Sequence, residues 1–188
     1  MIVTDNPLQM LLDKKSLDEL IYTQAMALDA QDWKTYRSCF ADEVNFDFSE
    51  HVERVVGQKI GAATDPDQWV RNSASVIPGF DSTMHTIASP VHVVRGDAAS
   101  SRCYIIAEHF LNDFGGERST TSSGIYTFDS IRTSDGWKIK NWRLKVLYYR
   151  GNLALYRVAA ERVREKTAGT VAGSSNLGIP EVDGAVRR

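Results

Sequence analysis

Four long segments rich in β-branched and aromatic residues fill the second half of this chain and constrain its fold most strongly. They are separated by the short stretches RGD, DFGGE and TSDG, whose glycine and aspartate are typical of hairpin turns. We expect strands over 83–94, 101–112, 119–132 and 137–150. Strands of about twelve residues exceed the usual five or six. The sequence therefore predicts an antiparallel meander that bends strongly.

Helical patterns dominate the first 80 residues. Ser16, followed three residues later by Glu19, predicts the capping box of a helix that ends near Ala30. A second short helix is expected at 31–40. The stretch DPDQWVRNSASVI begins with an acidic cap and a proline, which indicates a third helix.

Between the second and third helices, VNFDFS alternates with period two and indicates a strand, whereas 51–61 is polar and is expected to be a loop. Three helices followed by a curved meander predict an α+β fold with the helices on one face of the sheet. The 188 residues suffice for one domain with extensions. We expect an N-terminal extension at 1–11, the domain at 12–153, a helix at 154–166 and a flexible tail at 167–188.

Composition argues against several functional classes. The formal net charge is −2 with acids and bases interspersed, so no basic patch indicates a nucleic acid or a membrane surface as a partner. No apolar run is long enough to span a bilayer, and no basic stretch precedes an apolar one near the N-terminus, so a cytoplasmic location is expected. Cys39 and Cys103 are expected to be small buried hydrophobes rather than a disulfide.

One carboxylate interrupts an apolar helical stripe. Leu17, Ile21 and Ala25 recur every fourth residue, and Asp29 is the next position on that face. A cap at the helix end, or an ion pair with Arg37, would explain the carboxylate without chemistry. A catalytic role is the alternative.

Five separated motifs resemble the SnoaL-like division of the nuclear-transport-factor-two-like superfamily. They are LDAQDW, FADEVNFDFS, PGFDSTMHTIASP, AEH and SDGWKIKNW followed by YYRGN, and they span about residues 12–153. The resemblance implies a cone-shaped, cystatin-like roll in which a mostly antiparallel sheet wraps an apolar pocket and three helices close its mouth. The superfamily includes cofactor-independent dehydratases, a dehydrochlorinase, isomerases, polyketide cyclases and non-catalytic subunits, so the fold alone does not give the function.

The scytalone-dehydratase-like branch of the family implies a catalytic pair. In that branch, an aspartate at the position that Asp29 matches holds a histidine side chain. The matching histidine in this chain would be His85. A carboxylate on one imidazole nitrogen fixes the tautomer and leaves the other nitrogen as a base. The resemblance places His109 beside His85, to act on the leaving group or a substrate oxygen, although a buried structural histidine is the plainer alternative. A metal held by these three residues is a further alternative, but the pair explains them without one.

Arg143 is the remaining catalytic candidate. Alternation puts it on one strand face with Trp137 and Ile139, from which its guanidinium would bind an oxyanion or a departing anion, unless it leans into solvent. The paired tyrosines that hold a water in scytalone dehydratase correspond to Leu28 and Phe48, so a different substrate is expected. The expected substrate contacts are Tyr22, Phe46, Phe48, Trp69, Ile87, Tyr126, Phe128 and Asn141.

These residues predict a cofactor-independent lyase for a small hydrophobic, aromatic or polycyclic, hydroxylated substrate. Dehydration is the first choice, and retro-aldol or deformylating cleavage and double-bond isomerisation use the same base. The alternative is a non-catalytic small subunit of a ring-hydroxylating dioxygenase, or a ligand-binding module. His51 is expected in the polar loop and His92 on the outer strand face. Apolar residues expected on that outer face predict a homodimer or homotrimer: Val94, Tyr104, Phe110, Trp142, Leu144 and Tyr148.

Overall fold

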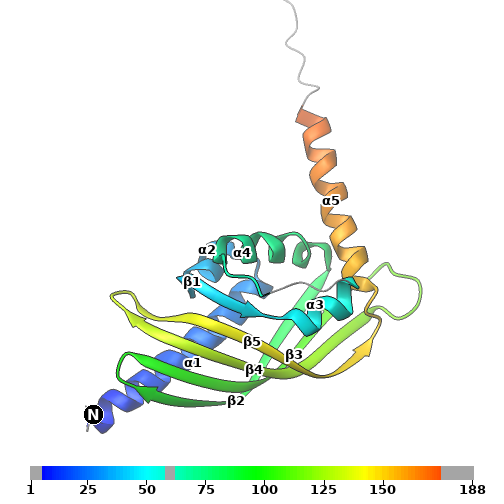
Figure 1. Cartoon of the computed structure of the whole chain (residues 1–188). Helices are drawn as coiled ribbons and strands as arrows, with labels where there is room; N and C mark the ends of the chain where they lie inside the picture. Colours follow the sequence, from blue (N-terminus) through cyan, green and yellow to red (C-terminus); the bar gives the residue numbers. More distant parts are fainter. Residues whose placement is uncertain (1–5, 58–61, 175–188) are drawn as a thin grey trace, which may run out of the picture.

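The long strands form one five-stranded sheet in the order β1–β5–β4–β3–β2 (Figure 1). The computed structural model describes residues 6–57 and 62–174. Four strands form an antiparallel meander, which β1 joins by pairing with β5 in parallel. The strands are β1 (Phe40–Asp47), β2 (Ser82–Arg95), β3 (Ala98–Phe110), β4 (Ser119–Thr133) and β5 (Gly136–Gly151). The predicted α+β class is confirmed, and the four long strands lie close to their expected bounds.

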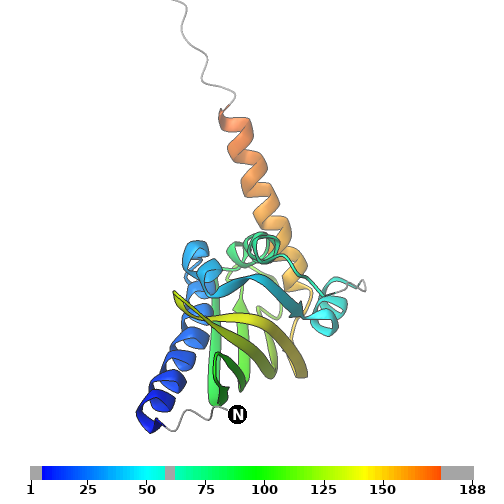
Figure 2. The same ribbon diagram turned by 60° about the vertical axis from the view of Figure 1, so that its left-hand side comes forward.

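Helices cover one face of this sheet. They are α1 (Pro7–Asp29), α2 (Trp33–Ser38), α3 (Ser49–Val56), α4 (Pro66–Ala74) and α5 (Leu155–Ser174), with a 3-10 turn, η1 (Ile77–Gly79). α1 packs against β2, and α5 projects away from the rest of the domain (Figures 1 and 2). The loop expected at 51–61 is wrong for its first part, which belongs to α3, and 58–61 lie outside the described residues. No helix in the described ranges is long and apolar enough to cross a membrane.

The first and last helices are longer than expected. α1 begins at Pro7, because Asn6 caps it by accepting the backbone N–H groups of Leu8 and Gln9. The capping box at Ser16 is therefore wrong, since this residue lies inside the helix. α5 continues to Ser174, past the expected end at 166, and 175–188 lie outside the described residues.

A β-bulge in β5 reverses the expected facing of its central residues. Lys140 is an extra residue in the pairing of β5 with β4. Because side chains alternate along a strand, one extra residue exchanges the two faces. Trp142 and Leu144 are therefore buried in the core, and Arg143 points outward. Their expected positions were wrong for this reason.

A second register shift has the same effect in β2, beside Ser89, whose φ is 53°. After it His92 and Val94 turn inward, so their expected place on the outer face is wrong. The His92 side chain is 5% exposed, with Nδ1 at 2.7 Å from the Ser101 hydroxyl and Nε2 at 2.9 Å from the Asp18 carboxylate. Val94 packs in a small cluster that includes the inner side of α1.

Aromatic rings fill the main core between the sheet and the helices. Trp142 lies among them and is 2% exposed. Its ring contacts those of Phe40, Phe46, Phe48, Trp69, Tyr126 and Phe128. Cys39 and Cys103 are buried free thiols, as expected.

α5 docks on the domain through its own apolar cluster. Leu155, Tyr156 and Ala159 pack against Phe80 and Leu111. A glycine in η1 permits this approach, because a Cβ on Gly79 would collide with backbone atoms of Ala159. The docking of α5 therefore depends on a residue without a side chain at this position.

We expect Gly79→Ala to lower the free energy of unfolding by about 1–3 kcal/mol, since the added methyl meets backbone that cannot rotate away. Gly115→Ala is the matched control, because a Cβ there meets nothing within 4 Å. Urea denaturation of both variants measures the difference. Equal stability of the two variants would contradict the close approach.

Candidate active site

A cavity of about 550 Å³ lies between the inner face of the sheet and the helices. This volume is typical of sites for small organic ligands. Most of the wall is apolar, from Leu28 of α1 to Ile105 of β3 and Trp142 of β5. The polar groups on the wall include three histidines, His51, His85 and His109.

The Asp29 carboxylate holds the His85 imidazole. Nδ1 of His85 lies 2.7 Å from Oδ1 of Asp29, and the two side chains are 8% and 21% exposed, respectively. Because an ionised carboxylate only accepts hydrogen bonds, Nδ1–H is the donor, which leaves Nε2 of a neutral ring without a proton. The predicted contact is confirmed by this geometry. The catalytic roles of both residues remain a prediction.

Two further donors fix the carboxylate. The Thr83 hydroxyl donates to Oδ1 and the backbone N–H of His85 donates to Oδ2, each at 2.7 Å. Asp29 is the last residue of α1, where the helix dipole disfavours a negative charge. Burial would raise the pKa of Asp29, but the His85 hydrogen bond and charge, with these donors, outweigh burial and hold it below its usual range.

The two structural alternatives for Asp29 do not hold. The cap of α1 is Ala30. Arg37 points elsewhere, with Nε at 2.6 Å from Oδ1 of Asp67. Asp29 therefore continues the apolar stripe of α1 in order to meet β2.

His109 lies beside His85 on the cavity wall, as expected. The two rings meet edge to face with centroids 5.4 Å apart. Burial, with smaller contributions from the neighbouring charges of His85 and His51, lowers the pKa of His109 to about 3. Because no carboxylate pairs with it directly, His109 is neutral at pH 7 and acts there as a hydrogen-bonding group.

His51 and Tyr156 are among the cavity residues that sequence reasoning missed. His51 lies on α3, with Nδ1 at 3.3 Å from the Tyr149 hydroxyl, and burial lowers its pKa to about 4. Tyr156 of α5 places its hydroxyl 3.2 Å from Nδ1 of His109 and 3.4 Å from the Ser122 hydroxyl. Burial raises the pKa of Tyr156 to about 12, so the phenol keeps its proton.

Signals for both missed residues exist in the sequence. His51, Val52 and Val55 have the spacing of one helix face, as do Tyr156 and Ala159 on α5. The pattern around His51 is short and has polar neighbours, so it does not stand out as a helix. The pattern around Tyr156 falls in a helix that is expected outside the domain.

Of the expected substrate contacts, Phe46, Phe48, Trp69 and Tyr126 line the cavity. Two others belong to the surrounding core instead: Phe128 is fully buried, and Ile87 packs against its cluster.

Three expected site residues point away from the cavity. Tyr22 is 38% exposed. Asn141 donates to Asp129 at 3.1 Å, and Nε of the exposed Arg143 donates to Oδ2 of Asp47 at 3.0 Å. The expected placement of these three side chains in the cavity is therefore wrong. Among the described residues, no group of three or more His, Cys, Asp or Glu side chains is arranged to hold a metal ion.

A model of the SnoaL-like domain matches residues 9–143 of the sequence. No curated protein sequence matches significantly. The Kfla4162 protein from Kribbella flavida is 24% identical, with a TM-score of 0.70 over 79% of this chain and 99% of that one.

Two further solved structures share the architecture. The dehydrochlorinase LinA-type3 from Novosphingobium barchaimii is 17% identical, with a TM-score of 0.63 over 77% of this chain and 93% of its own. A proposed scytalone dehydratase from Novosphingobium aromaticivorans is 14% identical, with a TM-score of 0.62 over 76% and 89%, respectively. At these identities the similarity establishes the fold.

We expect the free energy of unfolding to fall as the pH drops from 6.5 towards 4. The unfolded chain binds protons at His51 and His109 below pH 6.5, whereas the folded pKa values are about 4 and about 3. The unfolded state therefore binds more protons in this window, and each histidine contributes a slope of up to about 1.4 kcal/mol per pH unit. Urea denaturation at a series of pH values measures it.

The double variant His51→Gln/His109→Gln should show a shallower slope over the same pH window, whatever its stability at pH 7.5. An unchanged slope would show that these two histidines do not titrate as described.

Proposed function

The chain belongs to the family of SnoaL-like domains, and on that premise we propose that it is a cofactor-independent lyase. Its substrate is a small hydrophobic, aromatic or polycyclic, hydroxylated molecule. The observation that carries the proposal is the Asp29–His85 contact at the wall of a largely apolar cavity. A buried, carboxylate-oriented imidazole beside an organic ligand is suited to removing a proton from carbon.

In the proposed reaction His85 is the base. Its Nδ1 is occupied by Asp29, so Nε2 takes the carbon-bound proton, and the carboxylate stabilises the imidazolium that forms. The electrons of the broken C–H bond form the new double bond, and the C–O bond breaks. The departing hydroxide takes the proton that Nε2 of His85 has accepted and leaves as water, which returns the imidazole to its neutral form.

The polar cluster of His109, Tyr156 and Ser122 beside His85 is suited to assist this departure. Tyr156 keeps its proton, and its hydroxyl lies within reach of His109 and Ser122. Hydrogen bonds from this cluster would stabilise the charge that develops on the leaving oxygen. This role replaces the one expected of Arg143, which faces outward. Dehydration is the preferred reaction, and carbon–carbon cleavage or isomerisation would use the same base.

We expect His85→Gln and Asp29→Asn to lower turnover about 10²–10⁴-fold, the usual contribution of a general base. The measurement is mass-spectrometric detection of water loss from a panel of hydroxylated aromatic compounds. His92→Gln is the matched control, because His92 also contacts an aspartate, Asp18, at 2.9 Å but is not part of the cavity wall.

Turnover that survives His85→Gln and Asp29→Asn would contradict the proposed role of His85 as the base. Absence of turnover by the wild type across the panel, combined with ligand binding, would favour a binding module instead. Equal loss in His92→Gln would indicate a general effect on the fold.

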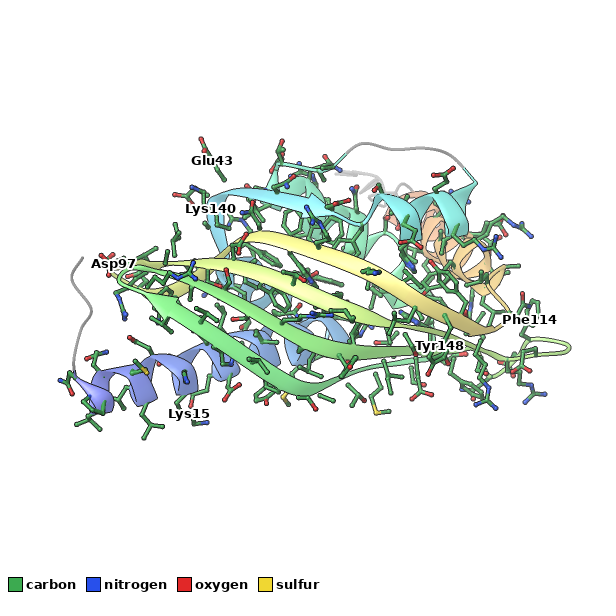
Figure 3. All side chains as sticks on the ribbon, turned by 60° about the horizontal axis from the view of Figure 1, so that its bottom comes forward. Lys15, Glu43, Asp97, Phe114, Lys140 and Tyr148 are labelled. Carbon is green, nitrogen blue, oxygen red and sulfur yellow. The ribbon has the colours of Figure 1, made fainter. Side chains whose placement is uncertain are left out.

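We further propose that the outer sheet face forms a homodimer or homotrimer contact (Figure 3). Tyr104 and Tyr148 are 54% and 55% exposed there. Ile106 of β3 lies opposite Ser123 of β4, which in turn lies opposite Tyr148 of β5. Neighbouring exposed apolar side chains of this kind mark interfaces. Phe110, which was also expected on this face, lies on β3 with Tyr104 and Ile106 and is 36% exposed.

The double variant Tyr104→Lys/Ile106→Lys should convert this oligomer into a monomer, because it places two charges in the buried contact. Light scattering coupled to size-exclusion chromatography gives the mass. A monomeric wild type, or an oligomer that survives the double substitution, would contradict this interface.

A further inference from the structure

The permanent charges on the cavity wall all have one sign. Among the described residues that line the cavity, Arg157 and Arg164 carry them, and no aspartate or glutamate is present. Asp29 is not part of the cavity wall, and its carboxylate is hydrogen-bonded to His85. A ligand in this cavity therefore meets two arginine side chains and no aspartate or glutamate on the wall itself.

Both arginines come from α5. Arg157, Ala160 and Arg164 are spaced by three and four residues, which places them on one helix face, and all three contribute to the cavity wall. The small side chain of Ala160 lies between the two long ones in the sequence. α5 begins after residue 143, where the match to the family model ends. This part of the wall is therefore a feature of this chain beyond the matched domain.

The orientation of α5 is fixed independently of these two residues. Leu155 and Ala159 are fully buried, and Arg162 anchors the helix by donating to the Gly79 carbonyl at 3.0 Å and to the Asp81 carboxylate. The face that carries Arg157 and Arg164 is therefore held at the cavity.

The guanidinium groups remain available to a ligand. Arg157 pairs with Glu161 at 2.9 Å, but these side chains are 68% and 43% exposed, and such surface pairs contribute little. Arg164 is exposed as well. Guanidinium groups bind carboxylates through paired, charge-assisted hydrogen bonds.

We propose that the substrate is an aromatic or polycyclic carboxylate, with its anionic group bound by Arg157 and Arg164 and its rings in the apolar interior. The inference rests on the proposed function for the reaction, but binding itself can be tested without turnover. The apolar interior disfavours a buried charge, so the anion lies at the α5 wall. This binding mode fixes which end of the substrate enters the cavity first.

Two fluorescent probes with one ring system separate charge from shape. 8-Anilinonaphthalene-1-sulfonate is anionic, and N-phenyl-1-naphthylamine lacks the sulfonate. We expect Arg157→Gln/Arg164→Gln to weaken binding of the anionic probe about tenfold, whereas binding of the neutral probe changes less than about twofold. Added salt should weaken binding of the anionic probe and leave binding of the neutral probe unchanged.

Lys166→Gln is the matched control. It removes one positive charge from the same helix, half the change made by the double substitution, at a side chain that donates to the Pro78 carbonyl instead of lining the cavity. This variant should bind the anionic probe like the wild type. An equal loss in Lys166→Gln, or equal effects of the double substitution on both probes, would overturn the proposal. Failure of both probes to bind the wild type would overturn it too.

The same titrations in His85→Gln separate this inference from the proposed reaction. Retained anion preference there, with no turnover by the wild type, would leave the α5 site standing and remove only the lyase. Turnover that depends on His85 without anion preference would remove only the α5 site.

Discussion

The contact between the end of α1 and the start of β2 is the interaction on which the site depends. Asp29 brings a negative charge to the carboxyl end of a helix and into a half-buried position, and both circumstances disfavour it. Three hydrogen bonds from Thr83 and His85 compensate. Because all three donors belong to the first residues of β2, the carboxylate joins the two elements and orients the imidazole at once.

The four histidines show that environment, and not residue type, assigns roles in this protein. His85 has a carboxylate and a place on the cavity wall. His51 and His109 share the wall but are dehydrated without direct carboxylate partners, so their rings stay neutral. His92 has the carboxylate of Asp18 but lies away from the cavity. Only His85 combines the features that a carbon base requires, because a base must reach both its orienting acid and the substrate.

Much of the fold could be predicted from the sequence because it depends on local patterns, whereas the pairing of Asp29 with His85 was predicted from the family resemblance. Long β-branched runs between glycine turns specified the meander, and the stripe of α1 specified where Asp29 points. Arg143 and His92 were misplaced because single extra residues in β5 and β2 exchange the two strand faces, and alternation cannot reveal such a bulge in advance. Tyr156 was missed because its helix docks through tertiary contacts, including the close approach at Gly79.

The charged side chains at the cavity come from two parts of the fold that differ in burial. The dyad comes from α1 and β2 inside the matched domain, where burial is acceptable because every charge has a partner. The arginines come from α5, where the guanidinium groups keep contact with water and avoid the cost of burial. Substitutions on the exposed face of α5 can therefore alter the wall without disturbing the Asp29–His85 contact. The proposed anion site and the Asp29–His85 contact therefore depend on different elements of the fold.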